Sequence, residues 1–300
     1  MLTIDQAFRK FKSRLELNAL EQQNATARHE ELRAHLRENL DLDDDFLTGS
    51  YRRYTKTKPL KDIDVFCVLG PEEQHFRKKH PSEVLARFEK ILVGKYGEAA
   101  VAQQRRSVCV DFGIVYGVTV DAEDKTNYRI LSMDTVPAIT FEDHYEIPDK
   151  TEGKWVKSNP KIHAEEAIAA QKAYSDEWKG IVRMVKYWNN HHGKPVKPSF
   201  LLEVMALECL HPPFSGQFAY EFQGLFATYA DRIMDSWPDP AGFGPPVSDM
   251  MTQSAKEAAR NAFQAAEQEA SNAIHLSRIG KNGEALSAWR KLFGPRFPLS

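Results

Sequence analysis

The 300-residue sequence has few cysteines, no large charge of one sign and no long apolar run. Its three cysteines, Cys67, Cys109 and Cys209, lack CxxC spacing, which excludes a disulfide framework and a four-cysteine zinc site. The 40 Lys and Arg against 42 Asp and Glu give a net charge of −2, which disfavours a dedicated nucleic-acid coat. Since no run of about 18 apolar residues is present, we expect no membrane-spanning helix. The charged N-terminal stretch also lacks a signal-peptide core, so a reducing cytoplasm is the expected location.

The hydrophobic pattern predicts an α+β protein with two lobes. A hydrophobic fraction of 42% with 27% charged residues is typical of a chain with a packed core. Residues 1–150 mix helical and strand patterns, and residues 151–300 are helical. Helices are predicted within 3–38, 81–97, 163–192, 199–210 and 249–278, strands within 62–70, 107–120 and 128–133, and turns at 41–45 and 121–127.

The run DIDVFCVLG (62–70) carries the most informative acidic residues. On a strand Asp62 and Asp64 project to one face, whereas Ile63 and Val65 project to the other. Two neighbouring carboxylates repel each other unless a cation lies between them. Mg²⁺ prefers such oxygen ligands, and Mn²⁺ is the alternative cation. The alternative is two solvated acids on an edge strand. The apolar run that follows the pair favours the metal-binding interpretation.

A third carboxylate has two candidates. Asp134 follows the strand pattern YRILSM, and Asp111 lies within VCVDFGIV. Because the end of a strand suits a metal ligand better than its middle, Asp134 is preferred and Asp111 is the alternative. Catalysis with two metal ions needs such a group near the attacking hydroxyl.

Gly49 and Ser50 lie shortly before the acid pair. Glycine permits close backbone approach, and a serine hydroxyl with nearby N–H groups can bind phosphate. The Gly-Lys-Ser/Thr of a Walker A motif is absent. The stretch 52–61 that follows is basic, and some of its charges could meet a triphosphate.

The segment GSYRRYTKTKPLKDIDVF, followed by MDTVPA, resembles the polymerase-β-like nucleotidyltransferase superfamily. The segments SNPKIH, GIVRMVKYWNN and KPSFLLEVMAL resemble helical-lobe motifs of its bacterial cGAS/DncV-like members (CD-NTases), the oligonucleotide cyclases of CBASS systems. The resemblance covers about residues 47–210. It implies a polymerase-β-like lobe with a mixed β-sheet and a helical lobe like that of oligoadenylate synthases.

The resemblance also implies roles for individual residues. They are phosphate binding by Gly49 and Ser50, metal binding and catalysis by Asp62, Asp64 and Asp134, contacts to donor phosphates by Lys186 and Ser199, and base stacking by Phe200. From the residues alone, Lys186 is more typical of a surface lysine and Phe200 of a core position.

The implied reaction is Mg²⁺-dependent synthesis of a cyclic di- or trinucleotide from nucleoside triphosphates, with ATP the expected substrate. In this family the product is read by a separate effector in anti-phage defence, and an activating partner protein is often needed; neither DNA nor a membrane is expected. Two alternatives stay open: a tRNA nucleotidyltransferase of the CCA-adding kind, and a nucleotide-binding or antitoxin-type protein without catalysis. These residues leave base choice, linkage and ring size open.

Overall fold

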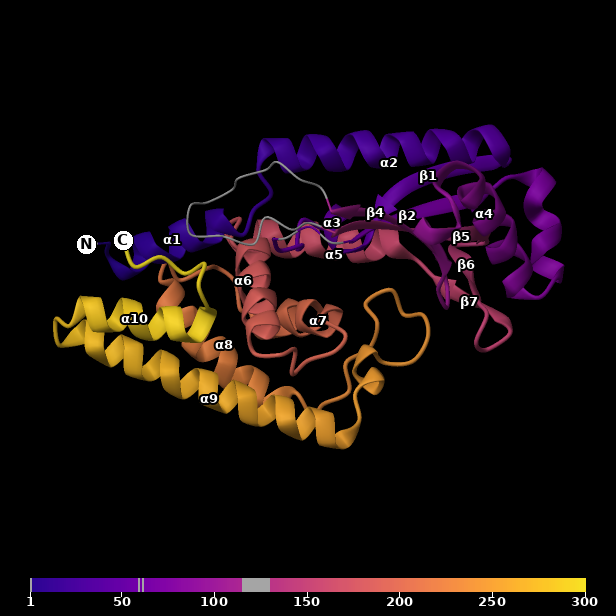
Figure 1. Cartoon of the computed structure of the whole chain (residues 1–300). Helices are drawn as coiled ribbons and strands as arrows, with labels where there is room; N and C mark the ends of the chain where they lie inside the picture. The colour runs from indigo at the N-terminus through magenta and orange to yellow at the C-terminus, as the bar shows by residue number, and fades with distance from the viewer. Residues whose placement is uncertain (1, 59, 61, 115–129) are drawn as a thin grey trace. The chain divides into compact units, whose positions relative to one another are not determined.

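The computed structural model describes residues 2–58, 60, 62–114 and 130–300 (Figure 1). The helices are α1 (Ile4–Arg14), α2 (Ala19–Asn39), α3 (Gly49–Arg52), α4 (Pro81–Tyr96), α5 (Pro160–Ala173), α6 (Trp178–His191), α7 (Phe200–Cys209), α8 (Phe218–Arg232), α9 (Gln253–Arg278) and α10 (Asn282–Phe293). The strands are β1 (Leu42–Thr48), β2 (Asp62–Leu69), β3 (Val101–Gln103), β4 (Val108–Ile114), β5 (Ile130–Phe141), β6 (His144–Asp149) and β7 (Lys154–Ser158). Short 3₁₀ helices are η1 (Pro71–Lys78), η2 (Glu98–Ala100) and η3 (Val247–Met250). The predicted turn at 121–127 lies outside the described residues.

The chain divides into two compact units, and the division differs from the expected boundary near residue 150. One unit is α/β and comprises residues 17–164, and the other is helical and comprises residues 1–16 and 165–300. Helix α1 therefore belongs to the helical unit. The reason is its apolar face: Phe8 lies 5.5 Å from Phe222 and 4.9 Å from Trp289 between ring centroids, and both Phe8 and Phe11 are fully buried.

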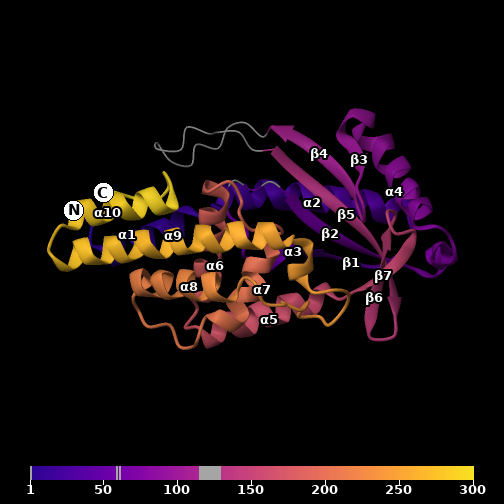
Figure 2. The same ribbon diagram turned by 90° about the horizontal axis from the view of Figure 1, so that it is seen from below.

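The α/β unit is built on a mixed sheet in the order β1-β2-β5-β4-β3, with β6 and β7 added beyond β5 (Figure 2). Strands β2 and β5 run parallel, and the other pairs are antiparallel. Helices α2 and α4 cover one face of the sheet, and their apolar side chains form one core with the strands. This core includes Leu32, Leu36, Ile63, Val65, Leu85, Phe88, Val108, Val110 and Met133.

The acidic stretch 41–45, predicted to be a turn, lies largely in strand β1. Its Asp45 is buried and forms ion pairs with Arg33 and Arg37 of α2. Two guanidinium groups compensate the buried charge, so an acidic run is tolerated in a strand.

Strand β5 is a single continuous strand that extends beyond the predicted segment 128–133 to Phe141. Asp134 consequently lies in the middle of a strand and not at its end, so the reason first given for preferring it is wrong. Pro137 of this strand is the Cα partner of Cys67 of β2 within the parallel ladder.

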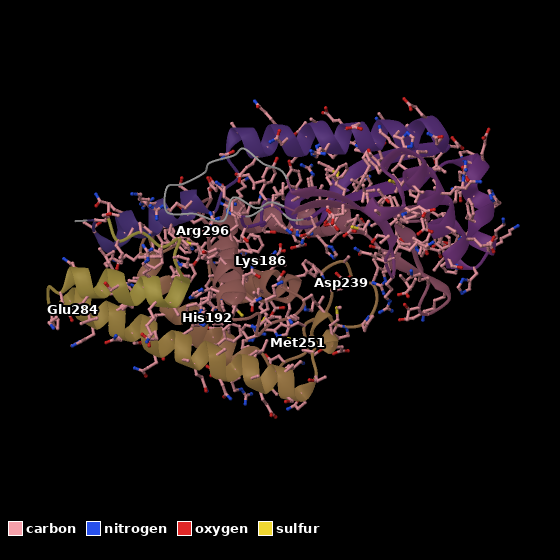
Figure 3. The ribbon with its side chains drawn as sticks, viewed as in Figure 1. Lys186, His192, Asp239, Met251, Glu284 and Arg296 are labelled. Atoms are coloured by element: carbon pink, nitrogen blue, oxygen red, sulfur yellow. The ribbon has the colours of Figure 1, made fainter. Side chains whose placement is uncertain are left out.

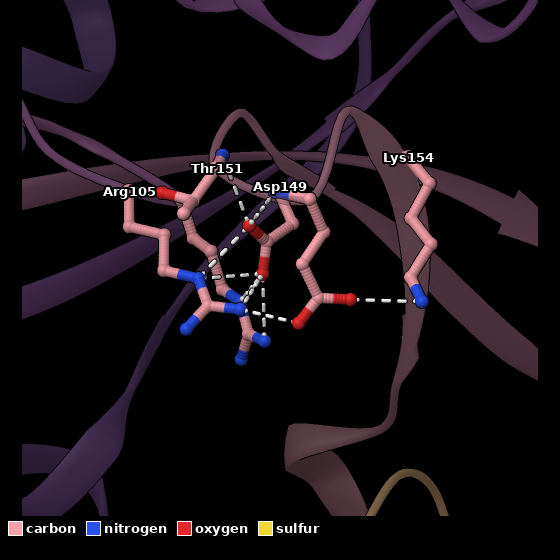
Figure 4. A network of polar contacts seen from close by, with 6 residues as sticks. Arg105, Asp149, Thr151 and Lys154 are labelled. Atoms are coloured by element: carbon pink, nitrogen blue, oxygen red, sulfur yellow. Dashed lines mark hydrogen bonds and ion pairs between the residues drawn. The ribbon is translucent and has the colours of Figure 1, made fainter.

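A charged network fixes the β6–β7 hairpin to the turn before β4 (Figure 4). The fully buried Asp149 accepts hydrogen bonds from Nε of Arg105 at 2.7 Å and Nε of Arg106 at 2.9 Å. The backbone N–H groups of Thr151 and Glu152 donate to its other oxygen. Burial alone would raise the pKa of Asp149, but these hydrogen bonds hold it well below its usual range. The hairpin and the start of β4 are thereby held together.

The helical unit packs α8, α9 and α10 around an aromatic core, and α9 runs antiparallel to α10 (Figure 1). The predicted helix over 163–192 is two helices, α5 and α6. They separate where Ser175 and Asp176 adopt positive φ values of 53° and 61°. Among the described residues, no helix is long and apolar enough to cross a bilayer.

Candidate active site

A row of four residues crosses the sheet at the predicted carboxylates. Asp64 of β2 is the Cα partner of Thr48 in β1 and of Asp134 in β5, and Asp134 is in turn the partner of Cys109 in β4. Neighbouring strands lie about 4.8 Å apart, and paired residues point to the same face. The fold therefore places two acidic side chains from distant parts of the chain side by side.

The acid pair lies on the face opposite the helix-covered core, as the alternation predicts. Ile63 and Val65 are both fully buried in the core beneath α2 and α4. Asp62 and Asp64 alternate with them and project from the other face. Asp62 is the Cα partner of Ser132, two residues before Asp134 on β5.

Asp134, not Asp111, is the acid beside the pair. Asp111 is the partner of Ser132, so one strand separates it from Asp62. Its side chain is exposed and accepts a hydrogen bond from the backbone N–H of Gly113 at 2.7 Å. The register of three strands places Asp134, and not Asp111, next to Asp64, and this register is not evident in the sequence.

Burial and neighbouring charges raise the pKa of Asp64 and of Asp134. Burial, followed by the charges of Asp62 and Asp134, raises the pKa of Asp64 to about 6, against the opposing charges of Lys56 and Arg53. Burial also raises the pKa of Asp134, and a hydrogen bond from the Cys109 side chain opposes that shift. In the described structure the buried Oδ1 of Asp134 has no hydrogen-bond partner. The site thus holds more negative charge than its protein surroundings neutralise.

Gly49 lies against this row. A Cβ atom at position 49 would lie 1.7 Å from Oδ2 of Asp64, and Gly49 has a φ of +64°. Only glycine fits both the contact and the backbone conformation. Ser50 follows in the short helix α3, and its carbonyl accepts the N–H of Thr55 at 3.0 Å. The predicted Gly-Ser loop and the acid pair are therefore neighbours in the fold.

The donor set fits a hard divalent cation. Carboxylate oxygens from two adjacent strands, crowded and partly without partners, are the ligands that such ions prefer, with water and phosphate oxygens completing the shell. Over the described ranges, no group of three or more His, Cys, Asp or Glu side chains is arranged to hold a metal ion. Asp62 instead accepts a hydrogen bond from Nζ of Lys56 at 2.6 Å.

The remaining predicted site residues lie in the helical unit. Lys186 of α6, labelled in Figure 3, is 6% exposed and forms an ion pair with the buried Glu203 of α7. Ser199 is exposed at the start of α7, and Phe200 is partly buried against the helical core. Sequence reasoning missed Glu203, although it is the one acid in the apolar run FLLEVMAL.

Sequence reasoning also missed Cys109. Its side chain is hydrogen-bonded to Asp134, and burial, with the nearby charge of Asp134, raises the pKa of the thiol to about 11. The thiol is therefore protonated at neutral pH and can donate to the carboxylate. The available signal was the alternation in VCVDF, which puts Cys109 and Asp111 on one face.

Comparison with known proteins finds one matching family and two similar sequences. Residues 1–121 match the SMODS family, the Second Messenger Oligonucleotide or Dinucleotide Synthetase domain. A Bacillus cereus protein named a probable cyclic nucleotide synthase is 26% identical over 281 residues, covering 83% of this chain and 81% of its own. The cyclic AMP-AMP-AMP synthase of an Acinetobacter species is 24% identical over 322 residues, covering 100% of this chain and 87% of its own.

A solved structure shows the same fold. CdnC of E. coli MS115-1, in its complex with HORMA-deltaN, superposes with a TM-score of 0.70 at 19% identity, covering 97% of this chain and 96% of that one. The chain therefore has the polymerase-β-like nucleotidyltransferase fold. The family match and the two relatives support a cGAS-like protein similar to the CD-NTase group.

Proposed function

We propose that the chain joins nucleoside triphosphates into a cyclic di- or trinucleotide in a Mg²⁺-dependent reaction, with Mn²⁺ as an alternative metal. The observation that carries the proposal is the row of Asp64 and Asp134, with Asp62 on the same face of β2. The names of the Bacillus cereus and Acinetobacter relatives support a cyclic product. ATP is the proposed substrate because one relative makes an all-adenine product.

The three acids form the proposed metal site. Asp62 and Asp64 would hold the cations, and Asp134 would complete the site and help to deprotonate the attacking ribose hydroxyl. The raised pKa of Asp134, caused by burial, suits a proton acceptor. When bound, divalent cations supply charge stabilisation at the attacking and leaving oxygens of an in-line displacement at the α-phosphate.

The donor triphosphate is proposed to bind at Gly49 and Ser50, beside the acid row, which we define as Asp62, Asp64 and Asp134. Lys186 and Ser199 are the proposed phosphate contacts of the helical unit, and Phe200 the proposed base platform. An ammonium group is a compact charge suited to phosphate. Phe200 is partly buried against the helical core, and stacking on a base is the proposed role of its aromatic ring.

The biological setting follows from the resemblance of the motifs. We propose cytoplasmic anti-phage defence, where nucleoside triphosphates are supplied and a separate effector reads the product. The complex of CdnC with HORMA-deltaN supports a protein activator for this chain too.

The experiment is incubation of the purified protein with all four NTPs and Mg²⁺ or Mn²⁺, followed by mass spectrometry of small products. A cyclic oligonucleotide and released pyrophosphate are expected, and the Asp62→Asn/Asp64→Asn variant is the control. CTP incorporation into added tRNA, with no small product, would instead identify a CCA-adding enzyme. Binding of ATP with Mg²⁺ but no pyrophosphate release, even with candidate activators added, would favour the non-catalytic alternative.

A further inference from the structure

Lys56 contacts the proposed metal site in a way that the proposed reaction does not use. It lies in the stretch between α3 and β2, and its Nζ is 2.6 Å from Oδ1 of Asp62. The Lys56 side chain is only 17% exposed, whereas that of Asp62 is 45% exposed. The ammonium group is therefore held against the sheet at the acid that is most open to solvent.

The charge of Lys56 acts on all three carboxylates. Besides its ion pair with Asp62, it lowers the pKa of Asp64 and of Asp134 through its charge, against the larger effect of burial. Arg53 acts in the same sense on Asp64. The exposed Arg52, in the same basic stretch, does not contribute to these shifts. Lys56 thus differs from Arg52, because the charge of Lys56 acts on all three carboxylates.

We infer that Lys56 is a resident counter-cation, which occupies an Asp62 oxygen that a divalent cation needs and must leave before that cation binds. This inference rests on the proposed function, because it takes the acid row as the metal site. Lys56 would then set the concentration of divalent cation at which the enzyme is loaded.

The chemistry of the two cations makes the exchange plausible in both directions. An ammonium group carries one charge on a flexible four-carbon stem and can rotate away without any change in the backbone. A divalent cation carries two charges and contacts several carboxylates at once, so it prevails when its concentration is high enough. At low concentration the tethered lysine prevails, since it is always present at the site.

Binding of Mn²⁺ to the nucleotide-free protein tests the inference without any turnover. The EPR signal of free Mn²⁺ would be titrated with the wild type, Lys56→Ala and Lys56→Arg, at low ionic strength. Removing both the competing group and its charge should tighten Mn²⁺ binding about tenfold, which corresponds to about 1.4 kcal/mol. Lys56→Arg keeps a competing cation and should bind Mn²⁺ no more tightly than the wild type.

Arg52→Ala is the matched control, because it removes one positive charge from the same stretch without touching the acids. Its dissociation constant for Mn²⁺ should change by about twofold or less, as expected for a solvent-screened charge. Thermal unfolding in the absence of metal checks that each variant is folded.

An equal or weaker Mn²⁺ affinity of Lys56→Ala overturns the inference, as does equal tightening by Arg52→Ala. Absence of Mn²⁺ binding in every variant also overturns it. The proposed function is judged separately by product formation with NTPs, so the two can fail independently.

Discussion

Asp64 and Asp134 are direct Cα partners in the parallel ladder between β2 and β5. This pairing puts two carboxylates on one face at the spacing of neighbouring strands, about 4.8 Å. The cost of the arrangement appears in Asp64, whose pKa is raised to about 6 by burial and by the charges of Asp62 and Asp134. The carboxylates outnumber the protein cations beside them, so this part of the sheet is suited to bind metal cations.

The acid pair is expected to be essential for synthesis. Replacing both acids in Asp62→Asn/Asp64→Asn keeps the side-chain volumes but removes two charges from the metal site. Since metal ions stabilise the transition state by several kcal/mol, product formation should fall by about 10³-fold or more. The measurement is product and pyrophosphate release from NTPs, with circular dichroism to show that the fold is kept. Synthesis near the wild-type rate would refute the metal assignment.

Asp134 and Asp111 are expected to differ sharply. Asp134→Asn removes the acid in register with Asp64 and should reduce kcat by at least about 10²-fold, the usual scale for a lost proton acceptor. Asp111→Asn, two strands from Asp62, should change kcat by less than about threefold, because a screened surface charge contributes little. The test is to measure kcat for both variants under the same conditions. The opposite order of effects would assign the third carboxylate to Asp111.

The stability of the metal-free protein should depend on pH through Asp64. Its pKa is about 6 in the folded chain and near 3.9 when unfolded. Between these values the folded chain retains a proton that the unfolded chain has lost, so the free energy of unfolding falls as pH rises. Asp64→Asn removes this cost, which is about 3 kcal/mol once pH exceeds 6.

Thermal melts in EDTA check this expectation. At pH 8 the Tm of Asp64→Asn should exceed that of the wild type by about 5 °C, and at pH 4.5 by less than half as much. Adding Mg²⁺ at pH 8 should raise the Tm of the wild type and leave that of the variant nearly unchanged. A Tm difference that is the same at both pH values would contradict the role given to Asp64.

Gly49 is expected to be required for its close contact with Asp64. Gly49→Ala puts a Cβ atom 1.7 Å from Oδ2 of Asp64 and forces that carboxylate to move. A displacement of about 1 Å in a catalytic group can cost about 10²-fold in rate, and we expect kcat to fall by that factor. Gly113→Ala is the matched control, because Gly113 has a similar φ of +69° with nothing within 4 Å of the added atom.

Both glycine variants share the cost of a left-handed alanine, about 1–2 kcal/mol, so the Tm should fall in both. The Tm of Gly49→Ala should fall at least as far as that of Gly113→Ala, because Asp64 is also displaced. A large loss of catalytic rate is expected only in Gly49→Ala. If Gly113→Ala loses as much activity as Gly49→Ala, backbone strain and not the contact with Asp64 explains the effect.

Local patterns predicted part of the site. The alternation around Ile63 predicts the common face of Asp62 and Asp64, because it depends only on the strand itself. The partnership of Asp64 with Asp134 depends on which strands pair and in what register, and this is set by long-range packing. Asp134 was therefore preferred for a reason that the continuous strand β5 shows to be wrong.

Two features of the fold depend on partners that are distant in the sequence. Asp45 looks like a turn residue until Arg33 and Arg37 of α2 are placed beside it. Helix α1 looks like part of the first lobe, but Phe8 and Phe11 complete the aromatic core of the helical unit. Neither partnership leaves a local signal, whereas the helical periodicity of α4 and α9 does.

The ion pair of Lys186 and Glu203 allows phosphate binding to be separated from stability. The exposed fractions are 6% for Lys186 and 2% for Glu203, so Lys186→Met alone takes the ammonium away from a buried carboxylate. This should destabilise the protein by about 3–5 kcal/mol, and any loss of activity would be ambiguous. Adding Glu203→Leu removes the charge left behind and should return the Tm to within a few degrees of the wild type, as apolar replacement of buried pairs often does.

The double variant then isolates the role of the ammonium. If Lys186 contacts the donor phosphates, the KM for ATP should rise about tenfold or more, since a charged hydrogen bond contributes about 1.5–3 kcal/mol. Glu203→Gln, which keeps the lysine, is the control and should change this KM far less. A double variant with a normal Tm and an unchanged KM for ATP would show that Lys186 serves only the packing of α6 against α7.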